Sequence, residues 1–286
     1  MKCGVFPGQG NQYIGMGKEI YHFEKARQIY DAASEISGID IKRISFEGTP
    51  EEQRDIVNLQ LLTFVNSCAW FNLIENNFQE LAGHSIGEYA ALYASRAFSF
   101  EQGLQIVRKR GELMKKVSFE EPSLVLVTNT PRKELEEFCE KTGLEIALYN
   151  SPKKYVIGGT PEKIKKFTPF LKGKVIPLKV SGPFHTSMYR DVSEEFAYFL
   201  LQLDFQAPET IVYSNYSTAP FTRNNIVKNL ALQLCNPVLW EYIIEKARSD
   251  EFVEIGPGNS LSRMIKEIRG NATTIHHARD LITMVC

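Results

Sequence analysis

The sequence predicts an α/β fold in which a large domain with a parallel sheet is interrupted by a smaller unit. Up to about residue 120, short apolar runs alternate with longer helical patterns, which is typical of parallel strands connected by helices. Between residues 123 and 180 the order changes to β-α-β-β-α-β, the order of a ferredoxin-like unit. A chain of 286 residues is long enough for both parts.

Strands and helices alternate in the predicted large domain. Before the smaller unit they are a strand at 2–6 (KCGVF), a buried helix at 61–77 (LLTFVNSCAWFNLIENN), a strand within 78–83 (FQELAG) and an amphipathic helix at 100–116 (FEQGLQIVRKRGELMKK). After it they are a helix at 193–203, a strand at 210–215, a helix at 225–234, a strand at 251–256 and a helix at 260–268. We therefore expect residues 1–122 and 181–286 to form one α/β domain.

The smaller unit has its own predicted strands and helices. The strands are expected at 123–129 (SLVLVTN), 144–150 (LEIALYN), 154–159 (KYVIGG) and 175–180 (VIPLKV), and the helices at 130–143 and 160–174. Both helices begin with Thr-Pro, so Thr130 and Thr160 are predicted to cap them, and Gly143 is predicted to end the first. Because the unit lies in the middle of the chain, we expect residues 123–180 to be an inserted ferredoxin-like subdomain.

The composition argues against several classes of protein. The formal net charge is −1, so no overall basic field points to nucleic acid. The sequence has no apolar run of about 18 residues that would predict a membrane span, and its N-terminus does not resemble a signal peptide. The cysteines and histidines are scattered without disulfide or metal-ligand spacing, which favours reduced thiols in the cytoplasm and no metal site.

Residues 83–87 read Gly-His-Ser-Ile-Gly, between a predicted strand and a predicted helix. In that context the Gly-x-Ser-x-Gly pattern indicates a nucleophile elbow, in which a tight turn requires small residues on either side of the serine. The hydroxyl of Ser85 would lie at the positive end of the helix, and the N–H of Ile86 could point at a developing oxyanion. The alternative is that Ser85 only caps the helix, but the strand–turn–helix context favours a nucleophile.

A serine nucleophile needs a base, and the best candidate is His185, in VSGPFHTSM, where the chain returns to the large domain. His84 is adjacent in sequence to Ser85, but its side chain should point away from the serine side chain. No aspartate lies between Ser85 and His185, and the glutamates there fall mostly in exposed helical patterns. We therefore expect a Ser–His pair whose imidazole is oriented by a neutral group, not by the carboxylate of a usual triad.

Two further stretches are candidates for the site. The loop at 6–12 (FPGQGNQ) lacks the signature residues of a P-loop or a dinucleotide-binding loop, but one of its N–H groups could be a second oxyanion donor. The helix at 100–116 carries Arg108, Lys109 and Arg110. These cations form either a solvated basic face or, if one arginine points inward, a clamp for a carboxylate.

Together these stretches resemble the malonyl-CoA:acyl-carrier-protein transacylase family, including the stand-alone acyltransferases that serve polyketide synthases. The resemblance covers nearly the whole chain and rests on seven motifs in the family's order: FPGQGNQYIGMG, AGHSIGEYAAL, RKRGELM, YNSPKKYVIGG, VSGPFH, LCNPVLW and EIGPGNSLSRMI. It implies an α/β-hydrolase-like large domain with an inserted ferredoxin-like small domain. The implied roles are Ser85 as the acylated nucleophile and His185 as its base. The N–H groups of Gln9 and Ile86 would form the oxyanion hole, and Gln233 would help to hold His185 in place of a triad acid.

The resemblance also implies how the acyl group is chosen. Arg110 would bind the free carboxylate of a malonyl group. An apolar Ile86 and the ring of Phe184 go with malonyl, because the ring fills the space that an α-methyl branch would need. Asn150, in a small-domain motif near the active-site cleft, and His84 would contribute to substrate binding. Two stretches depart from the family: position 11 is Asn where Ser is usual, and the atypical residues 119–130 leave the acyl preference open.

The implied reaction is a ping-pong transfer. Ser85 would take the malonyl group from malonyl-CoA, and the phosphopantetheine thiol of an acyl carrier protein would then take it from the serine. No bound metal or redox cofactor is implied. The alternatives are an acyl hydrolase that clears carrier proteins, against which Arg110 argues, and a silent docking module, against which the intact Ser85 and His185 argue.

A basic stretch of the inserted unit suggests where a carrier protein docks. Residues 153–174 contain a single acid, Glu162, against Lys153, Lys154, Lys163, Lys165, Lys166, Lys172 and Lys174. Because carrier proteins are usually acidic, these lysines are either a docking surface or simply a solubilising face. We expect the protein to be a monomer.

Overall fold

The computed structural model describes residues 1–74, 77–270 and 273–282. The helices are α1 (Glu24–Ser37), α2 (Ile41–Glu47), α3 (Pro50–Arg54), α4 (Ile56–Phe71), α5 (Gly87–Ala94), α6 (Phe100–Met114), α7 (Arg132–Thr142), α8 (Pro161–Phe167), α9 (Arg190–Leu200), α10 (Ile226–Cys235), α11 (Trp240–Lys246), α12 (Ser260–Arg269) and α13 (Ala278–Ile282). The strands are β1 (Lys2–Phe6), β2 (Glu80–Gly83), β3 (Leu124–Thr128), β4 (Glu145–Ser151), β5 (Lys154–Gly158), β6 (Lys174–Pro177), β7 (Ile211–Tyr213), β8 (Glu251–Glu254) and β9 (Thr274–His277). Short 3-10 helices lie at Thr168–Phe170 and Ser187–Tyr189.

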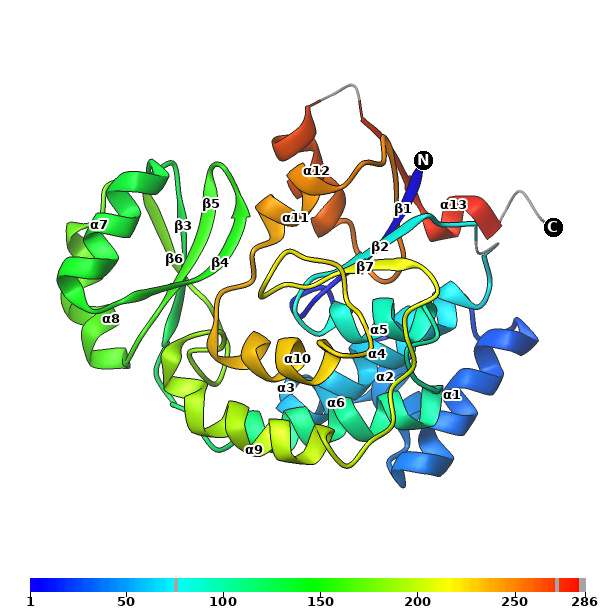
Figure 1. Cartoon of the computed structure of the whole chain (residues 1–286). Coiled ribbons are helices and arrows are strands. Elements are labelled where there is room, and N and C mark those ends of the chain that lie inside the picture. Colours follow the sequence, from blue (N-terminus) through cyan, green and yellow to red (C-terminus); the bar gives the residue numbers. More distant parts are fainter. Residues whose placement is uncertain (75–76, 271–272, 283–286) are drawn as a thin grey trace.

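The large domain is built on a parallel sheet with the strand order β7-β2-β1-β8-β9 (Figure 1). Successive side chains of a strand point to opposite faces of a sheet. On β1, Cys3 and Val5 therefore pack with residues of α11 and α12, whereas Phe6 packs in the core that includes α4 and α5. Helices thus cover both faces, as expected of a buried parallel sheet.

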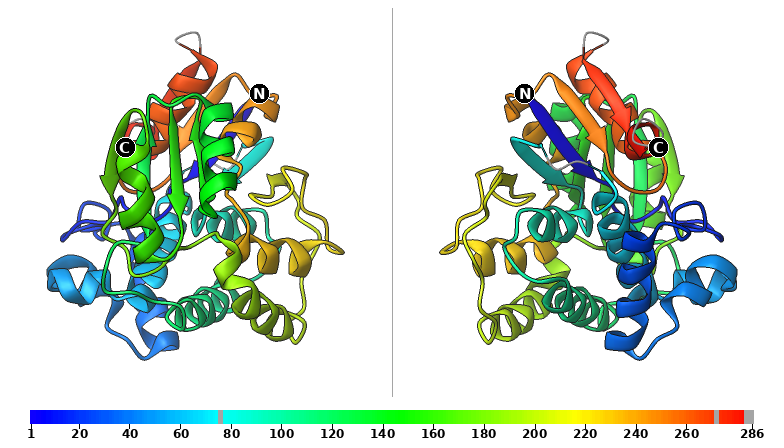
Figure 2. Two further views of the ribbon diagram at one scale, coloured as in Figure 1. Left: turned by 90° about the vertical axis from the view of Figure 1, so that its left-hand side faces the viewer. Right: turned by 90° about the vertical axis from the view of Figure 1, so that its right-hand side faces the viewer.

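The small domain is an antiparallel sheet with the order β4-β5-β3-β6, which is the ferredoxin-like arrangement. Its helices α7 and α8 lie on the side of the sheet that faces away from the large domain (Figure 1 and the left view of Figure 2). Apolar residues of α7 and α8 pack on one face of this sheet, where Val125, Val127 and Ile157 lie. The other face presents Leu126 and Val156 toward the large domain. The two sheets together confirm the fold class expected from the sequence.

One predicted helix cap is wrong. Helix α7 begins at Arg132, and the Thr130 side chain does not cap it, because its hydroxyl donates instead to the carbonyl of Lys172. The matching Thr160 does cap α8, accepting a hydrogen bond from the N–H of Lys163 at 3.3 Å. Gly143 ends α7 with φ 66°, as predicted.

The ends of two other predicted helices also differ from those in the structure. The helix expected at 61–77 is α4, which starts earlier, at Ile56, and ends earlier, at Phe71. Residues 75 and 76 of the expected helix lie outside the described residues. The helix expected at 160–174 ends at Phe167 and continues as a 3-10 turn.

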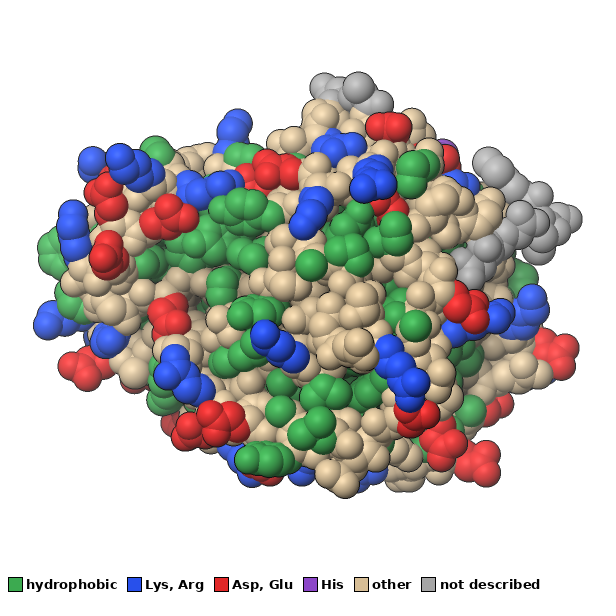
Figure 3. All heavy atoms as spheres, in the orientation of Figure 1, with side chains coloured by type: hydrophobic (Ala, Val, Ile, Leu, Met, Phe, Trp, Pro, Cys, Tyr) green, Lys and Arg blue, Asp and Glu red, His purple; other side chains and the backbone are tan. Residues whose placement is uncertain are grey.

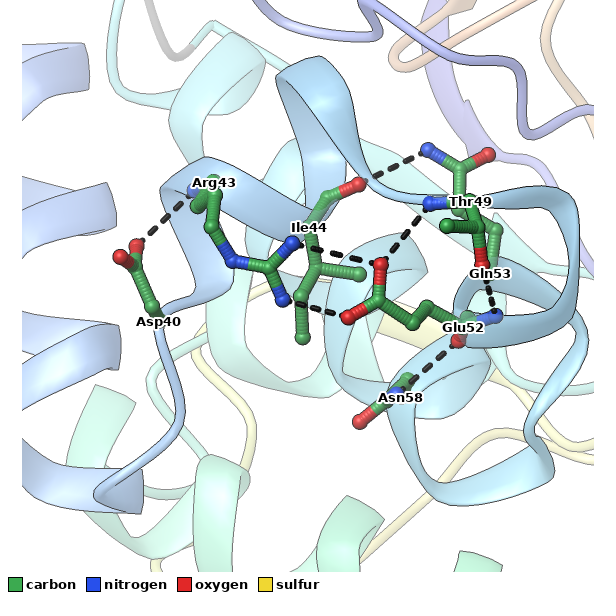
Figure 4. Close-up of polar contacts among 7 residues, drawn as sticks. All are labelled: Asp40, Arg43, Ile44, Thr49, Glu52, Gln53 and Asn58. Carbon is green, nitrogen blue, oxygen red and sulfur yellow. Dashed lines mark hydrogen bonds and ion pairs between the residues drawn. The ribbon is translucent and has the colours of Figure 1, made fainter.

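The corner between α2 and α4 was not predicted, although the sequence carries its signal. Thr49 and Glu52 form a capping box at the start of α3, and the Glu52 carboxylate also pairs with Arg43 at 2.5 Å (Figure 4). The Gln53 side chain donates to the carbonyl of Ile44 at 2.9 Å (Figure 4). These contacts fix the direction in which α4 enters the core.

The small domain is attached to the large one along β4. The N–H of Tyr149 donates to the carbonyl of Val238, and the N–H of Val238 donates to the carbonyl of Ala147, both at 2.9 Å. Beside this backbone contact, Arg132 of α7 pairs with the buried Glu241 of α11 at 2.5 Å. The segment that follows α10 is therefore bonded to both domains.

Across the described ranges, no helix combines the length and the apolar character that crossing a membrane requires. Within the same ranges, no three or more His, Cys, Asp or Glu side chains are grouped so that they could hold a metal ion.

Candidate active site

Ser85 lies at the turn between β2 and α5, in a backbone conformation that is unusual for a serine. Its φ is 52°, in the left-handed region. The flanking glycines are required by close packing: a Cβ at Gly83 would collide with the backbone of Gly87, and a Cβ at Gly87 would collide with the carbonyl of Phe6. Ser85 is partly exposed, so the turn presents its hydroxyl to solvent just beyond the carboxyl end of β2.

The structure brings His185 to Ser85 from 100 residues further along the chain. Ser85 Oγ and His185 Nε2 are 2.7 Å apart, and His185 Nδ1 is 2.7 Å from the backbone carbonyl of Gln233. Because that carbonyl can only accept, it fixes the proton on Nδ1 and leaves Nε2 free to accept the serine proton. The orienting group is neutral, and it is the main chain of Gln233, not its side chain.

The imidazole is held in its neutral form. Burial, and after it the charge of Arg110, lowers the pKa of His185 to about 3, although the bond to the Gln233 carbonyl opposes this shift. An unprotonated imidazole next to the serine hydroxyl is the state that a general base requires.

Arg110 of α6 points inward and is completely buried. Its Nη2 donates to Ser85 Oγ and to Gln233 Oε1, both at 3.2 Å, and its Nη1 donates to the side-chain oxygen of Gln60 on α4. Its guanidinium also lies 5.4 Å from the centre of the Tyr89 ring. Among the described residues, no carboxylate forms an ion pair with Arg110, so a buried cation beside the nucleophile is held only by neutral groups.

Gln9 lies beside the elbow because β1 and β2 are neighbours, with Phe6 opposite Gly83. The N–H of His84 donates to the carbonyl of Phe6 at 3.0 Å, which ties the loop after β1 to the turn. Within the part of the chain that the structure describes, neither the N–H of Gln9 nor that of Ile86 donates to another group of the protein. Both are free to bind an oxyanion.

A cleft of about 450 Å³ separates this loop from the inner face of the small sheet. Its lining includes Gln9, His84, Leu126, Leu148, Asn150 and Val156. His84 points away from Ser85, and its Nε2 lies 2.8 Å from Asn150 Oδ1, so these two residues connect the elbow to the small domain. A second cavity of about 360 Å³ also borders Gln9, and its lining includes Phe119, Glu120 and Pro122 of the atypical 119–130 stretch.

Ile86 directly follows Ser85 in the sequence, and Phe184 directly precedes His185. Both side chains are buried. The Phe184 ring packs against the ring of Tyr189 at a centroid distance of 5.7 Å. The side chain of Ile86 belongs to the main hydrophobic core.

Comparison with known proteins identifies the family of this chain. Residues 4–280 match the model of the acyl transferase domain family. The chain belongs to this family. This confirms the resemblance inferred from the seven motifs.

Two curated relatives of this acyltransferase illustrate the similarity. It is 36% identical over 283 residues to the polyketide biosynthesis malonyl CoA-acyl carrier protein transacylase PksC of Bacillus subtilis (strain 168), covering 94% of this chain and 97% of that protein. It is 33% identical over 293 residues to the malonyl CoA-acyl carrier protein transacylase of the same strain, covering 95% of this chain and 91% of that protein.

Solved structures show the same fold. The malonyl transacylase structure (MCAT) from Streptococcus pneumoniae has a TM-score of 0.90 and 31% identity, covering 97% of this chain and 95% of that one. A malonyl-transacylase in complex with a type II polyketide synthase acyl-carrier protein has a TM-score of 0.90 and 26% identity, covering 96% of this chain and 94% of that one.

Three buried residues of the acyltransferase site were missed by the sequence analysis: Gln60, Glu88 and Asn215. Each is a polar residue in or directly after an apolar stretch, which is the signal that could have drawn attention to them. Gln60 accepts from Arg110, Asn215 accepts from the N–H of Ser85, and Glu88 accepts from the side chain of Gln233.

The lysines of residues 153–174 do not form one uninterrupted basic surface. Lys154 pairs with Glu267 of α12, and Lys172 pairs with Glu134 of α7 at 3.4 Å. Figure 3 accordingly shows acidic and basic side chains mixed on the α7 and α8 end of the molecule. Among the described residues, no ion pair or hydrogen bond is made by the side-chain ammonium groups of Lys153, Lys165, Lys166 and Lys174.

Proposed function

We propose that this protein transfers a malonyl group from malonyl-CoA to an acyl carrier protein through an ester on Ser85. The observation that carries the proposal is the buried Arg110, whose Nη2 lies 3.2 Å from the Ser85 hydroxyl without a carboxylate partner. A dicarboxylic acyl group bound to Ser85 would supply that carboxylate, and a planar guanidinium can hold it with two parallel hydrogen bonds.

The first half-reaction forms the ester. Ser85 Oγ attacks the thioester carbonyl carbon while His185 Nε2 takes the hydroxyl proton. The N–H groups of Gln9 and Ile86 stabilise the oxyanion of the tetrahedral intermediate. The C–S bond then breaks, and the CoA sulfur leaves with the proton held by His185.

The second half-reaction transfers the malonyl group to the carrier protein and regenerates the free Ser85 hydroxyl. His185 takes the proton of the phosphopantetheine thiol, and the thiolate attacks the malonyl ester. The C–O bond to Ser85 breaks, and its oxygen recovers the proton from His185. Every step uses side chains and backbone N–H groups of this protein and its two substrates, so we propose that the reaction needs no bound metal or redox cofactor.

Malonyl is favoured over other acyl groups by three residues in this proposal. Arg110 selects a carboxylate, and Ile86 and Phe184 leave little room for an α-methyl branch. The hydrolase alternative finds no support, because the relatives reported above are named transacylases. A buried cation is also of no use for removing neutral acyl groups.

The partner and its docking surface belong to the proposal as well. We propose that the carrier protein approaches the small domain, residues 123–180, and that the lysines of 153–174 attract it. The protein would act as a monomer in the cytoplasm, and its large domain would comprise residues 1–122 and 181–286. The malonyl product would serve polyketide or fatty acid biosynthesis.

The proposal is tested by weighing the intact protein after mixing it with malonyl-CoA or acetyl-CoA. A malonyl adduct that is absent in Ser85→Ala is the expected result. Arg110→Ala should reduce malonyl loading far more than acetyl loading. Release of CoA without an accumulating adduct would identify a hydrolase, and equal losses for both acyl groups in Arg110→Ala would refute the carboxylate clamp.

A further inference from the structure

Asn215, which follows β7, is fully buried and holds the backbone on both sides of His84, directly before the nucleophile. Its Oδ1 accepts from the N–H of Ser85 at 2.7 Å, and its Nδ2 donates to the carbonyl of Gly83 at 2.6 Å. The left-handed conformation of Ser85 is unfavourable for an L-residue, so it persists only where the surroundings hold it. The Asn215 amide is placed to do so.

Glu88, in the first turn of α5, is also fully buried and connects Asn215 to α10. Its Oε1 accepts from the N–H of Asn215 at 2.5 Å, and its Oε2 accepts from Nε2 of Gln233. The same Nε2 lies 3.0 Å from the carbonyl of Ser85. Since the Gln233 carbonyl orients His185, the Glu88 carboxylate lies between the segment that holds the nucleophile and the helix that holds the base.

The carboxylate also determines how the Gln233 amide is turned. With Nε2 directed at Glu88, Oε1 faces Arg110 and accepts from its Nη2 at 3.2 Å. The amide therefore connects a buried acid to a buried cation. Burial raises the pKa of Glu88 to about 8, while the N–H donors of Asn215 and Gln233 and the charge of Arg110 oppose that shift. A neutral amide at position 88 has a single acceptor oxygen, so its NH2 group would face one of the two donors, the Asn215 N–H or Gln233 Nε2.

We propose that Glu88 and Asn215 are positioning residues of the transfer reaction. They hold Ser85 Oγ at hydrogen-bond distance from His185 Nε2, and they turn the Gln233 amide toward Arg110. Neither touches the acyl group. This inference rests on the Ser85 ester route proposed above, and it extends the site by two residues to which the sequence analysis gave no role.

The test compares Glu88→Gln, Asn215→Ala and Asn215→Asp with the unchanged protein. Two rates are measured: formation of the malonyl ester, and labelling of Ser85 by a fluorophosphonate, in which the serine oxygen bonds to phosphorus and fluoride leaves. Both rates should fall about tenfold or more in Glu88→Gln and Asn215→Ala, since small misplacements of reacting groups are costly. The KM for malonyl-CoA should stay within about threefold. Asn215→Asp keeps the acceptor for Ser85 N–H and should recover part of the loss.

Glu80→Gln is the matched control. Glu80 is an equally buried carboxylate on β2, where it accepts from Tyr213 Oη at 2.6 Å and from the N–H of Ser249 at 2.9 Å, away from the Ser–His pair. Its replacement should lower the melting temperature and leave both rates within about twofold. The change in rate, not in stability, therefore distinguishes a positioning role from a structural one.

Folded Glu88→Gln and Asn215→Ala proteins that label and load as fast as the unchanged protein would overturn the proposal. If Asn215→Ala does not fold, Glu88→Gln and Asn215→Asp decide by the same criterion. The labelling rate separates the two hypotheses. An unchanged protein that is labelled at Ser85 but forms no malonyl ester would refute the proposed function. The positioning role would then be decided by the labelling rates of the variants alone.

Discussion

Arg110 donates a hydrogen bond to the hydroxyl of Ser85, with Nη2 and Oγ 3.2 Å apart. The Arg110 donor that a carboxylate of the acyl group would accept is therefore bonded to the serine oxygen. In the proposed reaction, a malonyl carboxylate would draw this donor away from the serine oxygen. The same side chain would then select the substrate and free the nucleophile, and the predictions below depend on this relationship.

Gln60→Ala should weaken malonyl selection without touching the nucleophile. The Gln60 side chain accepts from Arg110 Nη1, and hydrogen bonds to charged groups contribute about 1.5–3 kcal/mol. We expect malonyl loading to fall about tenfold and acetyl loading to change less than about twofold. Gln53→Ala is the control, because Gln53 is also a buried glutamine but donates to Ile44 and Ser45. Equal losses for both acyl groups in Gln60→Ala would contradict the prediction.

Protonation of His185 should not lower the rate of acetyl loading between about pH 8 and about pH 5. A fall that begins near pH 8 would instead report Glu88, whose pKa is raised by burial to about 8. The neutral imidazole is the base, and it is present above the pKa of His185, which burial and Arg110 lower to about 3. Arg110→Gln removes the second of these causes, so the acid limb should move to higher pH. Acetyl-CoA is the substrate of choice here because it has no carboxylate for Arg110 to bind. An acid limb near pH 6.5 in the unchanged protein would disprove this account.

Phe184→Val should raise the ratio of methylmalonyl to malonyl loading by about tenfold, within the range of about 1–3 kcal/mol for one methyl group. The ring is buried against Tyr189, so some loss of stability is also expected. Phe196→Val is the control, since Phe196 is buried on α9 and lies in the same hydrophobic core. The two loading rates are measured with equal concentrations of the two thioesters, and an unchanged ratio would show that Phe184 does not border the acyl group.

Reversing Lys165 and Lys166 to Glu should slow transfer to an acidic carrier protein and leave loading from malonyl-CoA unchanged. Both side chains are exposed on the small domain. The effect should be about threefold or more at low salt and shrink as salt screens the attraction. Reversal of Lys25 and Arg27, which are exposed on α1 at the other end of the molecule, is the control (Figure 1). Transfer at the same rate in both double variants would eliminate this docking surface.

The fold was largely predictable because strand and helix periods are local. The strand at Lys2–Phe6, the turn at Ser85 and the β-α-β-β-α-β order all follow from neighbouring residues. Thr130 shows the limit. Its Thr-Pro pattern equals that of Thr160, but the Lys172 carbonyl, which only the folded sheet brings near, takes its hydroxyl instead. A competing partner distant in sequence cannot be read from the local pattern.

The active site was also predictable only in part. The missing aspartate before His185 predicted a neutral orienting group, and a backbone carbonyl now occupies that place. That the group is the main chain of Gln233 could not be predicted, because any residue carries such a carbonyl. Gln60 and Asn215 escaped notice for a related reason: a single buried amide has no spacing motif, and its function appears only when distant helices and strands meet.

Backbone hydrogen bonds join β4 to Val238, five residues after Gln233. Strand β4 of the small domain is thus hydrogen-bonded to the segment that directly follows α10, the helix whose Gln233 carbonyl orients His185. Engineers who exchange small domains to change carrier preference would also exchange a support of the base. A chimera that keeps residues 147–149 in their original register with Val238 should retain its turnover, whereas a junction cut through them would change partner choice and catalysis together.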